Sequence, residues 1–247
     1  VLSDPENISS VALSKNGRYL AVSRISTTKL FELVEVNRGI EVVKVVSTLL
    51  SGMGARIIKF VDEKKLLLMV DNDGDVTSVK FNVNDDENDD EDVSDFDDEQ
   101  QPVIYEMPET PEPTPDAISF DSKYNYTHLT VNSSGSAVAF SNFAGFIDIL
   151  NPTTGKASRL VHMSEIPTAI SFTSRDTLLV VTLSHKVYEF NTENAQGANL
   201  YTEWSKNNTE FIPRPFQKLP GECLGIFECL GTVSYTHLRA HETSAHL

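Results

Sequence analysis

The sequence predicts an all-β chain that forms a partial β-propeller, about four blades of a larger propeller. Three observations support this fold class. First, one pattern occurs four times: an apolar strand, a turn, a second apolar strand, another turn, and a third strand that ends polar. Second, once an insert is discounted, the copies start about 40–45 residues apart, which is the length of one blade. Third, strands do not alternate with helices as a parallel α/β sheet requires.

The clearest copies of the pattern span residues 8–34 and 128–161. In the first copy Asn16-Gly17 predicts a hairpin turn, because both residues tolerate a positive φ angle. Residues 41–50 (EVVKVVSTLL) then predict an outer strand. A helix is the alternative for their paired valines, but β-branched side chains favour a strand. Residues 128–161 predict a meander of four strands joined by Gly-containing turns.

The fainter copies span residues 55–82 and 167–191. The first contains the sequence DNDGD at residues 71–75, which resembles a calcium-binding loop. In such a loop glycine stands sixth, with helices on both sides, whereas here it stands fourth and no helix is expected. We therefore predict a tight turn and no metal site there.

Negative charge is concentrated in one segment. Of the 36 acidic residues, 16 lie between positions 81 and 122, where Lys and Arg are absent. The rest of the chain carries 20 acidic and 20 basic residues and is therefore neutral. Residues 84–101 are of low complexity and are expected to be disordered. The short apolar sequence at 103–105 is expected to return to the sheet as a strand.

These features predict the domain organisation. We expect propeller blades at residues 1–83, a disordered acidic and Pro-rich loop insertion at 84–122, and truncated propeller blades at 123–232. The insertion lies inside a blade, because the repeat pattern resumes after it.

The acidic tract has three interpretations. It can act as a solvated loop that keeps the chain soluble. It can attract basic partners electrostatically. It can also be phosphorylated at Ser94, whose surroundings DVSDFD resemble the target of an acidophilic kinase; a phosphate would deepen the negative field.

The last residues, 233–247, differ in composition from the rest. The sequence VSYTHLRAHET resembles a translated sequencing adapter, and three of the six histidines follow residue 233. We interpret this tail as non-native. The alternative is a metal-binding segment with His237, His241 and His246. Because the chain also begins without Met, we expect it to be a fragment of a longer protein.

Candidate catalytic features are weak in this sequence. It contains neither of the usual Gly-rich phosphate loops and no Gly-x-Ser-x-Gly motif. His162 and His185 stand apart, and Cys223 and Cys229 are too few for a zinc site. No apolar run approaches the roughly 18 residues of a membrane span. The sequence therefore predicts a non-catalytic protein that uses no cofactor, metal or small-molecule substrate and no membrane.

The last third of the chain carries its most distinctive sequences. These are KVYEFN at residues 186–191, YTEWSKNN at 201–208 and the apparent start of a further blade, GIF, at 225–227. Over about residues 7–227 the chain resembles the family of U3 small nucleolar RNA-associated protein four, called cirhin in animals. The chain departs from the general WD-repeat pattern, because Asp-Trp pairs are rare in it and no Gly-His pair opens a blade.

The resemblance implies a WD-repeat scaffold of the nucleus and nucleolus that belongs to the small-subunit processome and acts in ribosome biogenesis. Its partners would be other processome subunits and, within the complex, the 5′ external transcribed spacer of pre-rRNA. The protein would support the processing of pre-18S rRNA. The candidate partner-binding residues are Trp204, Lys206, Asn207 and Asn208, although residues 204–208 are equally well interpreted as a packed loop between blades.

Two other functions remain open from the sequence. The chain could be a WD-like adaptor that binds histones or other basic partners through its acidic loop. It could also be the lid or propeller portion of a larger enzyme. A hydrolase domain in the same gene would favour the enzyme, and RNA recovered by crosslinking would favour the scaffold.

Overall fold

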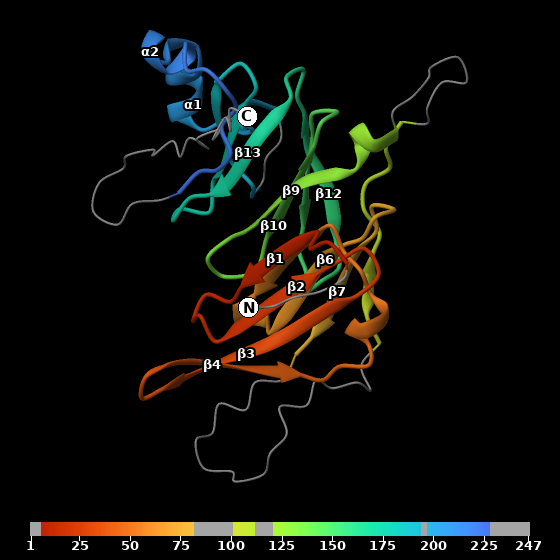
Figure 1. Ribbon diagram of the computed structural model, residues 1–247. Coiled ribbons are helices and arrows are strands. Elements are labelled where there is room, and N and C mark those ends of the chain that lie inside the picture. The colour runs from red at the N-terminus through yellow and green to blue at the C-terminus, as the bar shows by residue number, and fades with distance from the viewer. Residues whose placement is uncertain (1–5, 82–100, 112–120, 194–196, 228–247) are drawn as a thin grey trace, which may run out of the picture. The chain divides into compact units, whose positions relative to one another are not determined.

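The computed structural model describes residues 6–81, 101–111, 121–193 and 197–227. Their strands form four antiparallel sheets (Figure 1). In each sheet the strands follow one another in chain order, which is the meander of a propeller blade. The acidic stretch up to residue 100, with the candidate Ser94, and the predicted adapter tail lie outside the described residues.

We number the sheets as blades 1 to 4. Blade 1 contains β1 (Ser10–Leu13), β2 (Tyr19–Ser23), β3 (Thr28–Val36) and β4 (Gly39–Val45), and blade 2 contains β5 (Ile57–Val61), β6 (Leu66–Val70), β7 (Val76–Lys80) and β8 (Val103–Tyr105). Blade 3 contains β9 (Tyr126–Val131), β10 (Val138–Asn142), β11 (Phe146–Leu150) and β12 (Ala157–His162), and blade 4 contains β13 (Pro167–Phe172), β14 (Leu178–Thr182) and β15 (Val187–Phe190).

This organisation confirms the all-β fold class and the partial propeller of about four blades. The predicted short strand at 103–105 is β8, which pairs with β7. The outer strand of blade 1 is shorter than predicted, because β4 ends at Val45 rather than at residue 50. Ser47 Oγ accepts a hydrogen bond from Leu50 N (3.2 Å), and the chain turns there into a 3₁₀ helix, η1 (Leu50–Gly52), that buries Leu50.

The chain divides into two compact units, Val1–Met107 and Pro108–Leu247. In the first unit, blades 1 and 2 pack against each other. Ile58 N of β5 donates a hydrogen bond to Ser10 Oγ of β1 (3.1 Å), and just before these strands Ser9 Oγ donates one to Ala55 O (2.5 Å). Between the sheets lies one apolar cluster, which includes Leu30, Phe60 and Leu67. Each blade alone would expose this face, so the pair is the stable element.

In the second unit, blades 3 and 4 pack in the same way. Their shared core includes Ile147, Leu178 and Phe190, none of which exposes any surface to solvent. No helix within the described part of the chain is long and apolar enough to cross a membrane.

A buried carboxylate organises blade 3. Asp148 on β11 is fully buried; its Oδ2 accepts a hydrogen bond from the Tyr126 hydroxyl (2.6 Å), and its Oδ1 accepts one from Arg159 Nε (2.9 Å). Arg159 also donates to the carbonyls of Pro108 (3.3 Å) and Glu109 (3.1 Å). Burial, followed by the Asp148 charge, raises the pKa of Tyr126 well above its usual value. The network therefore fixes residues 108–109 against the blade.

The acidic turn of blade 2 is closed by its own first residue. Asp71 Oδ1 accepts hydrogen bonds from the backbone N–H groups of Asp73, Gly74 and Asp75, at 2.9, 2.8 and 2.9 Å. Gly74 has a φ angle of +99°, which glycine adopts without strain. Asp71 N also donates to Asp75 O (3.1 Å), so the segment is the predicted tight turn.

Candidate functional site

The candidate site lies where the chain leaves β15, and a helix takes the place of a fourth strand there. One antiparallel bridge joins Phe190 to Tyr201, and Thr202 N donates to Glu189 O (3.1 Å). The chain then enters helix α1 (Glu203–Asn208), a 3₁₀ helix η5 (Thr209–Phe211) and helix α2 (Arg214–Gln217). We call residues 201–226 the cap of blade 4.

The start of α1 follows from its sequence. Thr202 is the N-cap residue, and its hydroxyl accepts a hydrogen bond from Ser205 N (3.2 Å). Glu203 in the first turn suits the positive end of the helix dipole. Pro213 lies directly before α2, where its missing N–H costs no hydrogen bond. Thus two short helices follow each other across the blade.

Helix α1 and the 3₁₀ helix η5 also supply hydrogen bonds that a fourth strand would make. Ser205 Oγ accepts from Glu189 N (3.1 Å), and Thr209 Oγ1 donates to Val187 O (2.9 Å). The buried Glu189 carboxylate accepts from the hydroxyls of Thr177 (2.6 Å) and Thr202 (2.7 Å). The outer edge of β15 is therefore satisfied by side chains, and the helix is held in one position.

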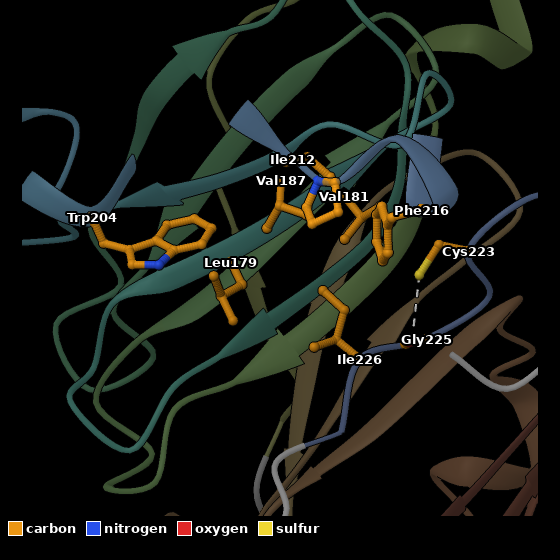
Figure 2. Close-up of a pocket in the computed structure, with 10 residues that line it drawn as sticks. Leu179, Val181, Val187, Trp204, Ile212, Phe216, Cys223, Gly225 and Ile226 are labelled. Carbon is orange, nitrogen blue, oxygen red and sulfur yellow. Dashed lines mark hydrogen bonds between the residues drawn. The ribbon is translucent and has the colours of Figure 1, made fainter. Parts of the chain in front are cut away.

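Beneath the cap is an apolar cavity of about 170 Å³. Figure 2 shows side chains from the sheet and from the cap around it, with Trp204 and Phe216 among them. Ten residues line it: Leu179, Val181, Val187, Trp204, Ile212, Pro213, Phe216, Cys223, Gly225 and Ile226. This lining suits an apolar side chain better than a polar ligand.

Cys223 is the buried thiol of this site. Its Sγ donates to Gly225 O at 3.4 Å (dashed in Figure 2), and burial raises its pKa. A thiol with a raised pKa is a weak nucleophile. Cys223 packs in one apolar cluster with Ala169, Leu179, Val181 and Val187.

The structure brings the four predicted partner-binding residues onto one helix. Trp204 is half-buried and faces the cavity, whereas Lys206, Asn207 and Asn208 are exposed. Lys206 Nζ pairs with Glu203 Oε1 (2.7 Å). The amides of Asn207 and Asn208 donate to the carbonyls of residues 203 and 204, at 2.8 Å each. Whether these residues bind a partner remains a prediction.

Two details of this region differ from the sequence-based expectation. Residues 203–208 form a helix rather than a loop between blades. Residues 225–227, interpreted as the start of another blade, have no strand conformation, and Ile226 instead packs against the outer face of blade 4. Sequence reasoning also missed Thr202, Ser205 and Thr209. A Thr followed by Glu is a helix-start signal that could have identified the N-cap.

The two histidines considered as catalytic candidates have structural partners. His162 Nε2 lies 3.2 Å from the Ala144 carbonyl, and its ring contacts Phe146 with centroids 4.3 Å apart. His185 Nε2 lies 2.9 Å from Gly221 O, beside the cap. Within the described ranges, no group of three His, Cys, Asp or Glu side chains is placed to hold a metal ion.

Replacing Ser205 with Ala should lower the free energy of unfolding by about 1–3 kcal/mol, because the buried N–H of Glu189 loses its acceptor. Asn207→Ala replaces an exposed side chain on the same helix and should change the free energy of unfolding by less than about 0.5 kcal/mol. Urea denaturation measures both. Equal values for the two variants would contradict the role assigned to Ser205.

The comparisons with known proteins agree with the predicted resemblance. U3 small nucleolar RNA-associated protein 4 of Saccharomyces cerevisiae is 31% identical over 233 residues, which is 92% of this chain and 28% of that protein. The Schizosaccharomyces pombe protein of the same name is 28% identical over 236 residues, 92% of this chain and 30% of that protein. The chain is therefore similar to these proteins over most of its own length, and it spans less than a third of theirs.

No protein-family model matches the chain. A solved β-propeller domain, Cps50 (Swd1) of Myceliophteria thermophila, aligns with 81% of this chain and 56% of that chain, with a TM-score of 0.46 and 17% identity.

Proposed function

We propose that this chain, as a segment similar to U3 small nucleolar RNA-associated protein 4, is part of a scaffold in the small-subunit processome. Its role is to hold partners while pre-18S rRNA is processed in the nucleolus, and it catalyses no step. The observation that carries the proposal is the similarity over 92% of the chain to two proteins whose names associate them with U3 small nucleolar RNA.

The structure supports a function in which the chain binds its partners through its surface. Both units have apolar cores between paired blades, and buried polar groups such as Asp148 and Glu189 are used for internal hydrogen bonds. The cap presents a half-buried aromatic residue, Trp204, beside exposed polar residues, an arrangement common in protein interfaces. The proposed partners are other processome subunits and, within the complex, the 5′ external transcribed spacer.

Crosslinking in cells tests the proposal. The full-length protein that carries this chain is tagged, crosslinked and purified, and the recovered RNA and proteins are identified. The variant with Lys206, Asn207 and Asn208 all changed to Ala should recover its partners about fivefold less well, the effect of losing roughly 1 kcal/mol of contacts. Lys156→Ala, an exposed change in the turn before β12, is the control and should recover them normally.

Two outcomes separate the alternatives. Loss of partners in the triple variant with normal recovery in the control supports a contact at α1. Recovery of histones without pre-rRNA would overturn the proposal and support the adaptor function. Thermal melting of each purified protein shows whether a variant has lost its fold instead.

A further inference from the structure

The outer strand of every blade has an edge whose backbone groups lack a further strand, and proteins usually protect such edges. Three of the four are protected here. β8 has only three residues. The β15 edge is bonded by Ser205 and Thr209 of the cap. β12 carries charged or polar side chains, including Arg159 and His162. Short length, coverage and polarity are the expected means of protection.

The fourth edge, that of β4, is the least protected, because it is neither short nor covered by a described segment, and only Glu41 and Lys44 among its seven residues are charged. β4 is seven residues long, and six of them are exposed. Its apolar residues Ile40, Val42 and Val43 are 65%, 49% and 42% exposed. In the described part of the chain no strand pairs with the outer side of β4, which is the last strand of blade 1 (Figure 1). An edge of this kind is a template for another strand.

The two central valines of β4 lie on opposite faces of its hairpin with β3. Val42 lies opposite Leu33 on one face of the hairpin, and Val43 lies opposite Glu32 on the other. Two charged residues flank the valines: Glu41 comes directly before Val42, and Lys44 comes directly after Val43. Because they are three positions apart in the strand, their side chains project to opposite faces. The edge thus offers apolar contacts on both faces and one charge on each.

We propose that β4 binds an extended segment of a partner protein as an additional antiparallel strand. Main-chain hydrogen bonds would supply affinity, and the side chains would supply specificity. Charge complementarity defines the segment: an acidic residue opposite Lys44, apolar residues opposite Val43 and Val42, a basic residue opposite Glu41 and an apolar residue opposite Ile40. The proposal goes beyond the scaffold function, because it holds whichever assembly the chain joins.

A second copy of this chain fits the edge less well. Along two antiparallel strands, residue pairs that exchange backbone hydrogen bonds alternate with residue pairs that exchange none. Each residue of the edge strand can therefore take part in only one of these two kinds of pair. In a symmetric dimer, residues opposite each other must therefore differ in number by an even amount. Glu41 and Lys44 differ by three, so two copies cannot place these charges opposite each other.

The test uses the whole chain and a labelled peptide, Thr-Val-Glu-Val-Val-Lys-Val-Thr, that satisfies this pattern. Fluorescence anisotropy measures binding, and amide hydrogen exchange locates it. The peptide should slow exchange of the β4 amides, and a peptide with Glu and Lys interchanged should bind about fivefold more weakly. The double variant Val42→Lys, Val43→Lys should weaken binding about tenfold.

The matched control is Val103→Lys, Ile104→Lys on the short edge strand β8, which should leave binding unchanged. Circular dichroism melting confirms that both variants fold. Equal binding of the two peptides, protection on a strand other than β4, or equal loss in both double variants would overturn the proposal. Protection of β4 that increases with protein concentration without peptide would overturn it in favour of a second copy.

Discussion

Replacing Asp148 with Ala should lower the free energy of unfolding of the second unit by about 3 kcal/mol. Asp148 is fully buried, and its loss removes a hydrogen bond from the Tyr126 hydroxyl and the carboxylate that balances the charge of Arg159, which keeps its hydrogen bonds to the carbonyls of residues 108 and 109. The figure is at the lower end for a broken buried pair, because the Arg159 side chain is 25% exposed and water can solvate part of it. Urea denaturation followed by circular dichroism measures the change.

The control for Asp148 is an ion pair on the surface. Glu203→Ala removes the carboxylate that pairs with Lys206 in the first turn of α1; the Glu203 side chain is 82% exposed, so a loss of less than about 1 kcal/mol is expected. If Asp148→Ala proved as harmless as Glu203→Ala, the buried network would not organise blade 3. Arg159→Ala should also release residues 108–109, which hydrogen exchange would detect.

Replacing Gly145 with Ala should lower the free energy of unfolding by about 3 kcal/mol, through two separate causes. Gly145 has a φ angle of +86°, where an L side chain is strained. An added Cβ would also lie 2.2 Å from the Met163 carbonyl oxygen, which is backbone and cannot rotate away. Gly145 O accepts a hydrogen bond from Met163 N (2.8 Å), so the strain would reach the pairing of β11 with β12.

Gly155→Ala separates the two causes. Gly155 has a similar φ angle, +72°, but beyond its two chain neighbours no residue has a heavy atom within 4 Å of the added Cβ. Only the backbone strain remains, and the cost should be about 1 kcal/mol. Thermal or urea denaturation compares the two variants. An equal cost for both would show that the close approach to Met163 does not matter.

Where apolar residues recur between turn residues, the sequence predicts the strands well. Strands β5, β6 and β7 lie within the repeat predicted at residues 55–82, and β13, β14 and β15 lie within the repeat predicted at 167–191. Most of these strands pack at least one face into a core between blades, which forces apolar residues into a period of two or into a continuous run. The turns between them are marked by residues that tolerate positive φ, such as Gly17 and Gly145.

Local sequence could mark the start of α1 but could not predict the cap as a whole, because distant residues stabilise it. A six-residue helix is marginal by itself. Helix α1 forms because Ser205 and Thr209 bond to β15, and because Thr202 bonds to the buried Glu189. These contacts join residues 13 to 22 positions apart, beyond the reach of local patterns. Of the candidate site, the sequence identified Trp204 and its exposed neighbours but not the side chains that hold the helix.

The end of β4 shows the same limit on a smaller scale. The valines of residues 41–50 favour a continuous strand, yet the chain turns after Val45 to bury Leu50 in the core between blades 1 and 2. Burial of this single side chain decides the strand end, and neither β propensity nor the period of the sequence contains that information.

The most direct measurement of the central claim is the map of RNA crosslinked to the full-length protein. A scaffold of the small-subunit processome should give reads concentrated in the 5′ external transcribed spacer of pre-rRNA, together with peptides of other processome subunits. Reads spread evenly over cellular RNA, or a protein recovered with no pre-rRNA, would contradict the proposed function.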